Sequence, residues 1–202
     1  MKKLLLVLLG CLLLCGCGNQ NVPEATVRED LVAQPVDEEV ATEAPAETHA
    51  PEEEKYYLTF TAKDVNGTEV TSDVLADSKL TMLNIWATYC NPCLEEMPYL
   101  GEIALEYDSS EFQIIGIVSD VSEQSEQEDI DYAKELIAQT QANYPHLLLG
   151  QDLYNTLVGG VTAVPTTFFV KQDGEVLGYV TGAADKATWK ELIDELLAEV
   201  EG

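Results

Sequence analysis

Two cysteines three residues apart, Cys90 and Cys93, are the side chains of this sequence best suited to chemistry. They lie between an apolar run, Leu80–Trp86, and apolar residues at helical spacing, so we expect them where a buried strand ends and a helix begins. Pro92 suits the first turn of that helix. The unpaired N–H groups and the positive end of the helix dipole would stabilise a thiolate at Cys90, and Cys93, one turn on, can close a disulfide with it. The spacing predicts a thiol–disulfide redox pair.

A zinc site and a purely structural disulfide are the alternatives for this pair. A four-ligand zinc site needs more cysteine or histidine ligands, and His146 is the only histidine in residues 56–202. The redox interpretation is therefore favoured, and no metal is expected. The redox group would be the Cys90–Cys93 disulfide itself rather than a bound cofactor.

The start of the chain is typical of a targeting segment. Lys2 and Lys3 precede an apolar run at residues 4–14, which is too short to span a membrane as a helix. We interpret residues 1–16 as a signal peptide.

The end of this segment, Leu14-Cys15-Gly16-Cys17, resembles a bacterial lipobox, with a leucine at −3 and a small residue at −1 from the lipidated cysteine. Cys17 is the best candidate for lipidation, because Cys11 would leave a very short apolar run and Cys15 follows a bulky leucine. An ordinary secretory signal is the alternative. We expect an extracytoplasmic protein that is lipid-anchored to the bacterial cell membrane, in a compartment where disulfides persist.

Residues 19–55 have the composition of a tether. They hold four prolines, few large apolar side chains and 11 acidic residues against Arg28 and Lys55, a net charge of −9. Such a segment cannot bury enough apolar surface to fold, and its charge favours extension. It would reach about 35 Å as a coil and about 120 Å when stretched. With the lipidated Cys17, it forms a disordered acidic segment, residues 17–55.

Residues 56–202 have the length of a single domain. The apolar pattern predicts a leading hairpin about Asn66-Gly67, strands at 80–86 and 112–118, helices at 92–107 and 129–142, a short apolar piece at 146–149, a short helix at 152–158, a hairpin of strands 166–170 and 175–180, and a last helix capped by Asp185. This order indicates an α/β fold in which helices flank a central mixed sheet.

Three stretches resemble the TlpA/ResA group of membrane-tethered thioredoxin-like proteins: residues 83–93 (LNIWATYCNPC), 96–98 (EMP) and 160–168 (GVTAVPTTF). The resemblance implies a thioredoxin-like fold with an N-terminal β-hairpin and a central insertion. It also implies dithiol–disulfide exchange with proteins, in which Cys90 is the attacking thiol and Cys93 the resolving one.

The resemblance implies further site residues. Pro165 would be a cis-proline facing the disulfide, and Trp86, Tyr89 and Val164 would lie on the substrate side. From the residues alone, Pro165 could equally be a loop breaker before a strand.

Glu96 matches an acid that many of these proteins place three residues after the second cysteine. A solvated acid in the first helical turn is the alternative for Glu96. Asn84 stands where thioredoxin has a buried acid, so we expect that proton acceptor to be absent.

Two other functions are possible on a related fold: a peroxiredoxin-type peroxidase and a non-enzymatic metal-binding or docking lipoprotein. A peroxidatic P-x-x-x-T-x-x-C pattern fails, because Asn84 holds the proline place and Thr88 is only two residues before Cys90. A copper-delivery protein would need a C-x-x-x-C motif and a distant histidine. This chain has C-x-x-C, with His146 as the available histidine, so the pattern does not favour copper delivery.

Charge restricts the partners and the direction of electron flow. Residues 56–202 carry 6 lysines against 26 acidic residues, a net charge of −20, which excludes nucleic acid. No lysine or arginine occurs in residues 80–133, and Glu95 and Glu96 follow the cysteines, so little would stabilise the thiolate. We expect a reductant of client protein disulfides that is kept reduced by a membrane electron donor of the thiol-transporting type.

Replacing Cys17 with Ser should release the protein from the membrane or leave an unprocessed precursor, because serine cannot carry the thioether-linked lipid. Membrane fractionation with immunoblotting checks this. Normal processing together with normal membrane retention would contradict the assignment of Cys17.

Overall fold

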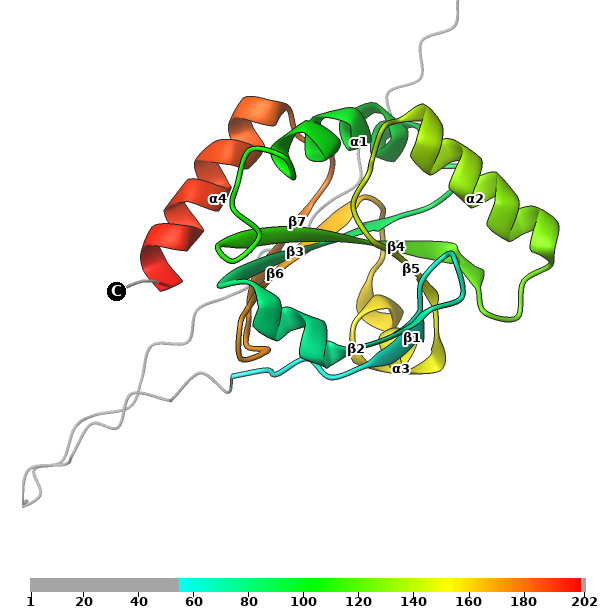
Figure 1. Cartoon of the computed structure of the whole chain (residues 1–202), viewed down its shortest axis with the longest axis horizontal. Helices are drawn as coiled ribbons and strands as arrows, with labels where there is room; N and C mark the ends of the chain where they lie inside the picture. Colours follow the sequence, from blue (N-terminus) through cyan, green and yellow to red (C-terminus); the bar gives the residue numbers. More distant parts are fainter. Residues whose placement is uncertain (1–54, 201–202) are drawn as a thin grey trace, which may run out of the picture. The chain divides into compact units, whose positions relative to one another are not determined.

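The computed structural model describes residues 55–200. The signal peptide, Cys17 and the tether as far as residue 54 lie outside the described residues. The domain is built on a five-stranded mixed sheet in the order β5-β4-β3-β6-β7 (Figure 1). The strands are β3 (Leu80–Trp86), β4 (Phe112–Ser122), β5 (His146–Leu149), β6 (Thr166–Lys171) and β7 (Val176–Thr181).

The central strand, β3, determines which residues meet at the site. All seven of its residues are buried, as expected for an apolar strand covered on both faces. It runs parallel to β4, with Trp86 opposite Val118, and antiparallel to β6, with Ile85 opposite Thr166. The residues after β3 and those before β6 therefore meet at one end of the sheet, which we call the cysteine end.

Helices and a hairpin cover the two faces of the sheet (Figure 1). On one face, Trp86, Met97 and Trp189 belong to one buried cluster, and on the other, Phe60, Leu83 and Leu153 belong to a second. The first face carries α1 (Asn91–Ile103), α2 (Gln127–Gln139) and α4 (Lys186–Val200), and the second carries the antiparallel pair β1 (Thr61–Lys63) and β2 (Glu69–Thr71), the 3-10 helices η1 (Ser72–Asp77) and η2 (Val158–Gly160), and α3 (Gln151–Thr156).

The predicted fold class is confirmed, including the leading hairpin and the mixed sheet. The expected central insertion corresponds to the segment between β4 and β6, which holds α2, β5 and α3. Some predicted bounds were wrong. Helix α1 ends four residues early, since the chain turns after Ile103, and α2 ends at Gln139 because Gln141 takes a positive φ of 56°. Strand β4 continues to Ser122 beyond the apolar run that signalled it.

Among residues 55–200, no helix has both the length and the apolar character that a membrane crossing requires.

His146 is a core residue that links β5 to β3. Its Nδ1 accepts a hydrogen bond from Trp86 Nε1 at 3.1 Å, and its Nε2 lies 3.0 Å from the carbonyl oxygen of Ala142. Burial lowers the pKa of His146 to about 4, so the ring is neutral and Nε2 is the donor. Gly116 lies beneath this ring, and a Cβ there would overlap the imidazole. The absence of a side chain in β4 makes room for a polar one from β5.

Gly116→Ala should therefore destabilise the domain by about 1–3 kcal/mol through overpacking against His146. Urea unfolding followed by tryptophan fluorescence measures the effect. Gly178→Ala in β7 is the matched control, because a Cβ at that position meets nothing within 4 Å. Equal stability of the two variants would show that the ring over Gly116 is not closely packed.

Candidate active site

Cys90 and Cys93 form a disulfide at the start of α1. Cys90 is the N-cap of the helix, and its Sγ accepts a hydrogen bond from the backbone N–H of Cys93 at 3.2 Å. Cys90 keeps 6% of its surface exposed, whereas Cys93 has none. A client sulfur can therefore approach only the first sulfur of the pair, and the helix N-terminus would stabilise a thiolate there.

The loop before β6 packs against the disulfide. The Val164–Pro165 peptide bond is cis, as predicted. The carbonyl oxygen of Val164 lies 3.6 Å from Cys90 Sγ, so a thiol at Cys90 would find an acceptor there. The structure thus brings together three of the predicted residues, Cys90, Val164 and Pro165.

Glu96 is buried beneath α1, with 1% of its surface exposed. Its Oε1 accepts from Asn84 Nδ2 at 3.0 Å, and its Oε2 accepts from the backbone N–H of Ala184 and from Trp189 Nε1, both at 3.2 Å. Burial raises the pKa of Glu96, and the three donors oppose this rise because they favour the carboxylate. Glu96 lies one turn after Cys93 on the buried side of the same helix.

This geometry corrects one sequence interpretation. The alternative of a solvated acid at Glu96 is wrong, because the side chain faces the core. The thioredoxin-type acid is absent at position 84, as expected from the sequence. Asn84, on β3, does not carry the carboxyl group but donates to it, and the acid comes from α1 instead. One buried acid is present, supplied by a different element.

The loop between β3 and α1 is fixed by a carboxylate. Asp120 accepts from the Thr88 backbone N–H at 3.0 and 3.1 Å and from the Thr88 hydroxyl at 2.5 Å. Ser119 Oγ donates to the carbonyl oxygen of Trp86 at 2.9 Å. These contacts from β4 hold the two residues that flank Ala87 and thereby position Tyr89 and Cys90.

Of the three predicted substrate contacts, Trp86 was wrong. Its side chain is fully buried, and its indole N–H is used by His146. Tyr89, in contrast, is 75% exposed. Tyr89 and Val164 line a hollow of about 320 Å³, which we call the tyrosine hollow, together with Ser119, Leu149, Tyr154 and Val161 among others.

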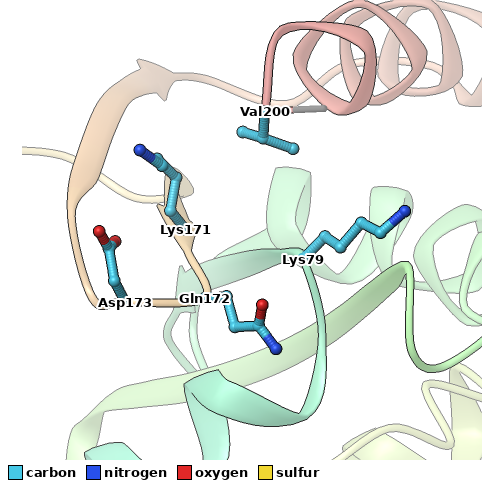
Figure 2. A pocket seen from close by; sticks show the side chains of 5 residues that line it. All are labelled: Lys79, Lys171, Gln172, Asp173 and Val200. Atoms are coloured by element: carbon cyan, nitrogen blue, oxygen red, sulfur yellow. The ribbon is translucent and has the colours of Figure 1, made fainter. Parts of the chain in front are cut away.

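A second hollow, of about 370 Å³, is shown in Figure 2. It lies at the end of the sheet opposite the cysteine end. Its lining includes Lys79, Lys171 and Val200, and Lys171 stands opposite Leu80 at the start of β3. The two lysines form ion pairs at 2.8 Å with Glu111 and Glu175. None of the predicted site residues contributes to this hollow.

His146 cannot serve as the distant histidine ligand that the metal-binding alternative needs. Both ring nitrogens of His146 are engaged within the core, so neither is available to a metal. Within residues 55–200, no three side chains of His, Cys, Asp or Glu gather as a metal site.

Sequence reasoning missed the residues that support the pair. Asn84, Ala184 and Trp189 come from three distant segments, and no spacing rule connects them to Glu96. Asp120 had a signal, because it lies near the carboxyl end of a parallel strand, where functional residues gather.

Comparison with known proteins agrees with this geometry. The Redoxin family matches residues 40–193. The chain belongs to the Redoxin family. It is 34% identical over 109 residues to the thiol-disulfide oxidoreductase ResA of Oceanobacillus iheyensis, covering 53% of this chain and 52% of that protein. It is 30% identical over 129 residues to ResA of Bacillus thuringiensis, covering 63% and 68%. The resemblance to the TlpA/ResA group is confirmed.

One further relative and two solved structures extend the comparison. The thiol:disulfide interchange protein HelX of Rhodobacter capsulatus is 33% identical over 126 residues, 61% of this chain and 64% of HelX. The chain thus spans about half to two-thirds of the relatives it matches. A thiol:disulfide interchange protein of Chlorobium tepidum superposes with a TM-score of 0.58 at 22% identity, over 71% of this chain and 97% of that one. The exposed lipoprotein thioredoxin Etrx1 of Streptococcus pneumoniae superposes with a TM-score of 0.55 at 25% identity, over 68% of this chain and 98% of that one.

Glu96→Gln should lower the pKa of the reduced cysteine pair by about one unit, because it removes a buried negative charge one turn from Cys93. Thiolate absorbance at 240 nm as a function of pH measures this. Glu95→Gln is the matched control, since Glu95 is exposed and its charge is screened by water. Equal shifts in the two variants would exclude a special influence of Glu96.

Proposed function

We propose that this chain is a lipid-anchored, extracytoplasmic thiol–disulfide oxidoreductase that reduces disulfides in client proteins. The observation that carries the proposal is the Cys90–Cys93 disulfide at the N-terminus of α1, with only Cys90 reachable from solvent. The names of the ResA and HelX relatives support the same chemistry. The lipobox at Cys17 and the exposed lipoprotein among the similar structures support the anchor.

The reaction begins from the reduced pair. The Cys90 thiolate attacks one sulfur of a client disulfide, a bond forms between them, and the other client sulfur leaves as a thiolate that takes up a proton. The Cys93 thiolate then attacks Cys90 Sγ and breaks the mixed disulfide. The client leaves as a dithiol, and the Cys90–Cys93 disulfide closes. Two electrons pass to the client, and a membrane dithiol donor must return two to the pair.

Three groups support the two steps. The backbone N–H of Cys93 stabilises negative charge on Cys90 Sγ, to which it already donates. The Val164 carbonyl can accept from the Cys90 thiol once the disulfide has opened. The buried carboxyl group of Glu96 lies one turn after Cys93 on the same helix, and we propose that it exchanges a proton with this resolving thiol, which has no exposed surface of its own.

Charge around the pair favours the reducing direction. A strong oxidant stabilises its attacking thiolate, which favours the reduced form. Here Glu96 is buried near the pair, and residues 80–133 contain no lysine or arginine. Lys186 and Lys190 lie on α4 but pair with Glu106 at 2.6 and 2.7 Å, near the far end of α1. The thiolate therefore gains little beyond the helix N-terminus.

Cys93→Ser should accumulate mixed disulfides through Cys90, because the second step is blocked, and Cys90→Ser should not. Non-reducing gels followed by mass spectrometry of the trapped species measure both, and they also identify the client. Client cross-links through Cys93 in the Cys90→Ser chain would reverse the two roles.

The midpoint potential of the pair should lie nearer to that of thioredoxin, about −270 mV, than to that of DsbA, about −120 mV. Equilibration with dithiothreitol and glutathione buffers, followed by alkylation and mass analysis, gives the value. A midpoint near −120 mV would reject the reducing direction while leaving the exchange chemistry intact.

A further inference from the structure

We propose that the client segment reduced at Cys90 carries a bulky apolar side chain and basic residues. The apolar side chain enters the tyrosine hollow, and the basic residues face residues 120–129, which we call the acidic connection. This inference rests on the proposed function and specifies the chemistry of its substrate. The client is then a cationic, partly unfolded protein segment rather than a small disulfide.

The first observation is the place of the hollow. Val164 lies in its wall, and the carbonyl oxygen of the same residue is 3.6 Å from Cys90 Sγ. A client chain whose cysteine reaches Cys90 therefore passes the mouth of the hollow within one or two residues. Its volume of about 320 Å³ suits a side chain rather than a whole domain.

The second observation is the lining. Tyr89 and Tyr154 are 75% and 51% exposed, although both are large and aromatic. They come from different elements, the loop before α1 and helix α3, and both line the hollow. Leu149, Val158 and Val161 add aliphatic side chains to the lining, and Ser119 and Thr162 add hydroxyl groups. Aromatic rings that stay exposed beside aliphatic side chains are characteristic of surfaces that bind apolar side chains.

Gly159 lies beside the ring of Tyr154. A Cβ built on Gly159 would lie 3.5 Å from two atoms of this ring, so the glycine leaves the space that the ring occupies in the wall of the hollow.

The third observation is charge. Residues 80–170 supply the disulfide and the whole lining of the hollow, and they carry 14 acidic residues and one basic residue, Lys134. Asp120 follows Ser119, which lines the hollow. Glu126, Glu128 and Asp129 come next and are exposed at the start of α2.

The acidic connection, residues 120–129, and the disulfide occupy the same end of the sheet. Strands β3 and β4 are parallel, so the residues that follow β4 lie at the cysteine end. Within residues 55–200, Lys63 pairs with Glu123 at 3.8 Å, and Asp120, Glu126, Glu128 and Asp129 form no ion pair. The negative potential of these carboxylates attracts a basic client segment and repels an acidic one.

Four synthetic peptides closed by one disulfide test the inference. They differ only in the residue beside the attacked cysteine, Phe or Ser, and in the flanks, Lys or Glu. The full chain is reduced, freed of reductant and mixed with each peptide, and the reduction rate is followed by quenching and chromatography. The Phe–Lys peptide should be reduced fastest. Phe in place of Ser, and Lys in place of Glu, should each raise the reduction rate about tenfold. Half-molar salt should diminish the lysine preference and leave the phenylalanine preference.

Variants assign each preference to its surface. Tyr154→Ala should lose the phenylalanine preference, and Tyr154→Phe should keep it. Tyr57→Ala should also keep it, since Tyr57 is a half-exposed tyrosine that pairs with Glu175 at the opposite end of the sheet. Glu126→Gln with Glu128→Gln should weaken the lysine preference. Glu195→Gln with Glu199→Gln, the same charge change on exposed residues of α4, should not.

The outcomes separate the two claims. Equal rates for all four peptides would overturn the inference while upholding disulfide reduction. A preference for the Glu or Ser peptides, or preferences unchanged in the Tyr154 and Glu126/Glu128 variants, would overturn it as well. No reduction of any peptide would overturn the proposed function itself.

Discussion

A carboxyl group removed from water needs hydrogen-bond donors, and Glu96 receives them from three parts of the chain. Asn84 reaches it from β3, Ala184 from the segment before α4, and Trp189 from α4 itself. Because Glu96 belongs to α1, these bonds fix the helix that carries the disulfide against the sheet and against the last helix. A lost donor would leave a buried acceptor only partly satisfied and would loosen this helix. These hydrogen bonds, together with the core packing of Met97 and Leu100, hold the cysteine pair in position.

The two sides of α1 then perform different tasks. Its buried side holds Cys93, Glu96 and Met97 in the core, without contact with solvent. Its N-terminus presents Cys90 to the outside, next to the Val164 carbonyl and the exposed ring of Tyr89. A reaction that needs one accessible sulfur and one protected sulfur is thereby supported by a single helical turn.

Much of this arrangement could be predicted from the sequence, because the signals were local. The apolar run before Cys90, the proline after it and the alternation around Gln172 determine elements through contacts between near neighbours. The cis bond at Pro165 followed from the family resemblance. The contacts that needed a fold to exist could not be predicted. Trp86 was assigned to the substrate side, although register places it in the core beside His146.

The same limit applies to Glu96 and Asn84. The sequence shows an acid in a first turn and an amide in a strand, and both patterns are common in solvated and in buried positions. Which of them holds the charge inside the protein depends on how α1 lies across β3, a property of the tertiary packing. The predicted helix ends were wrong for a related reason. Gln141 takes a positive φ, and glutamine is not a residue type that signals this conformation.

The chain enters the domain far from the cysteine pair. The first described residues pair with the turn after β6, through Leu58 N–H to the Gly174 carbonyl oxygen and Val176 N–H to the Tyr56 carbonyl oxygen. Strand β6 begins beside Pro165 and runs away from it for six residues, about 20 Å, so the chain enters at the pole opposite the disulfide. Cys90 and the tyrosine hollow are therefore kept apart from the place where the chain enters the domain. A client protein can approach the disulfide without meeting the first described residues.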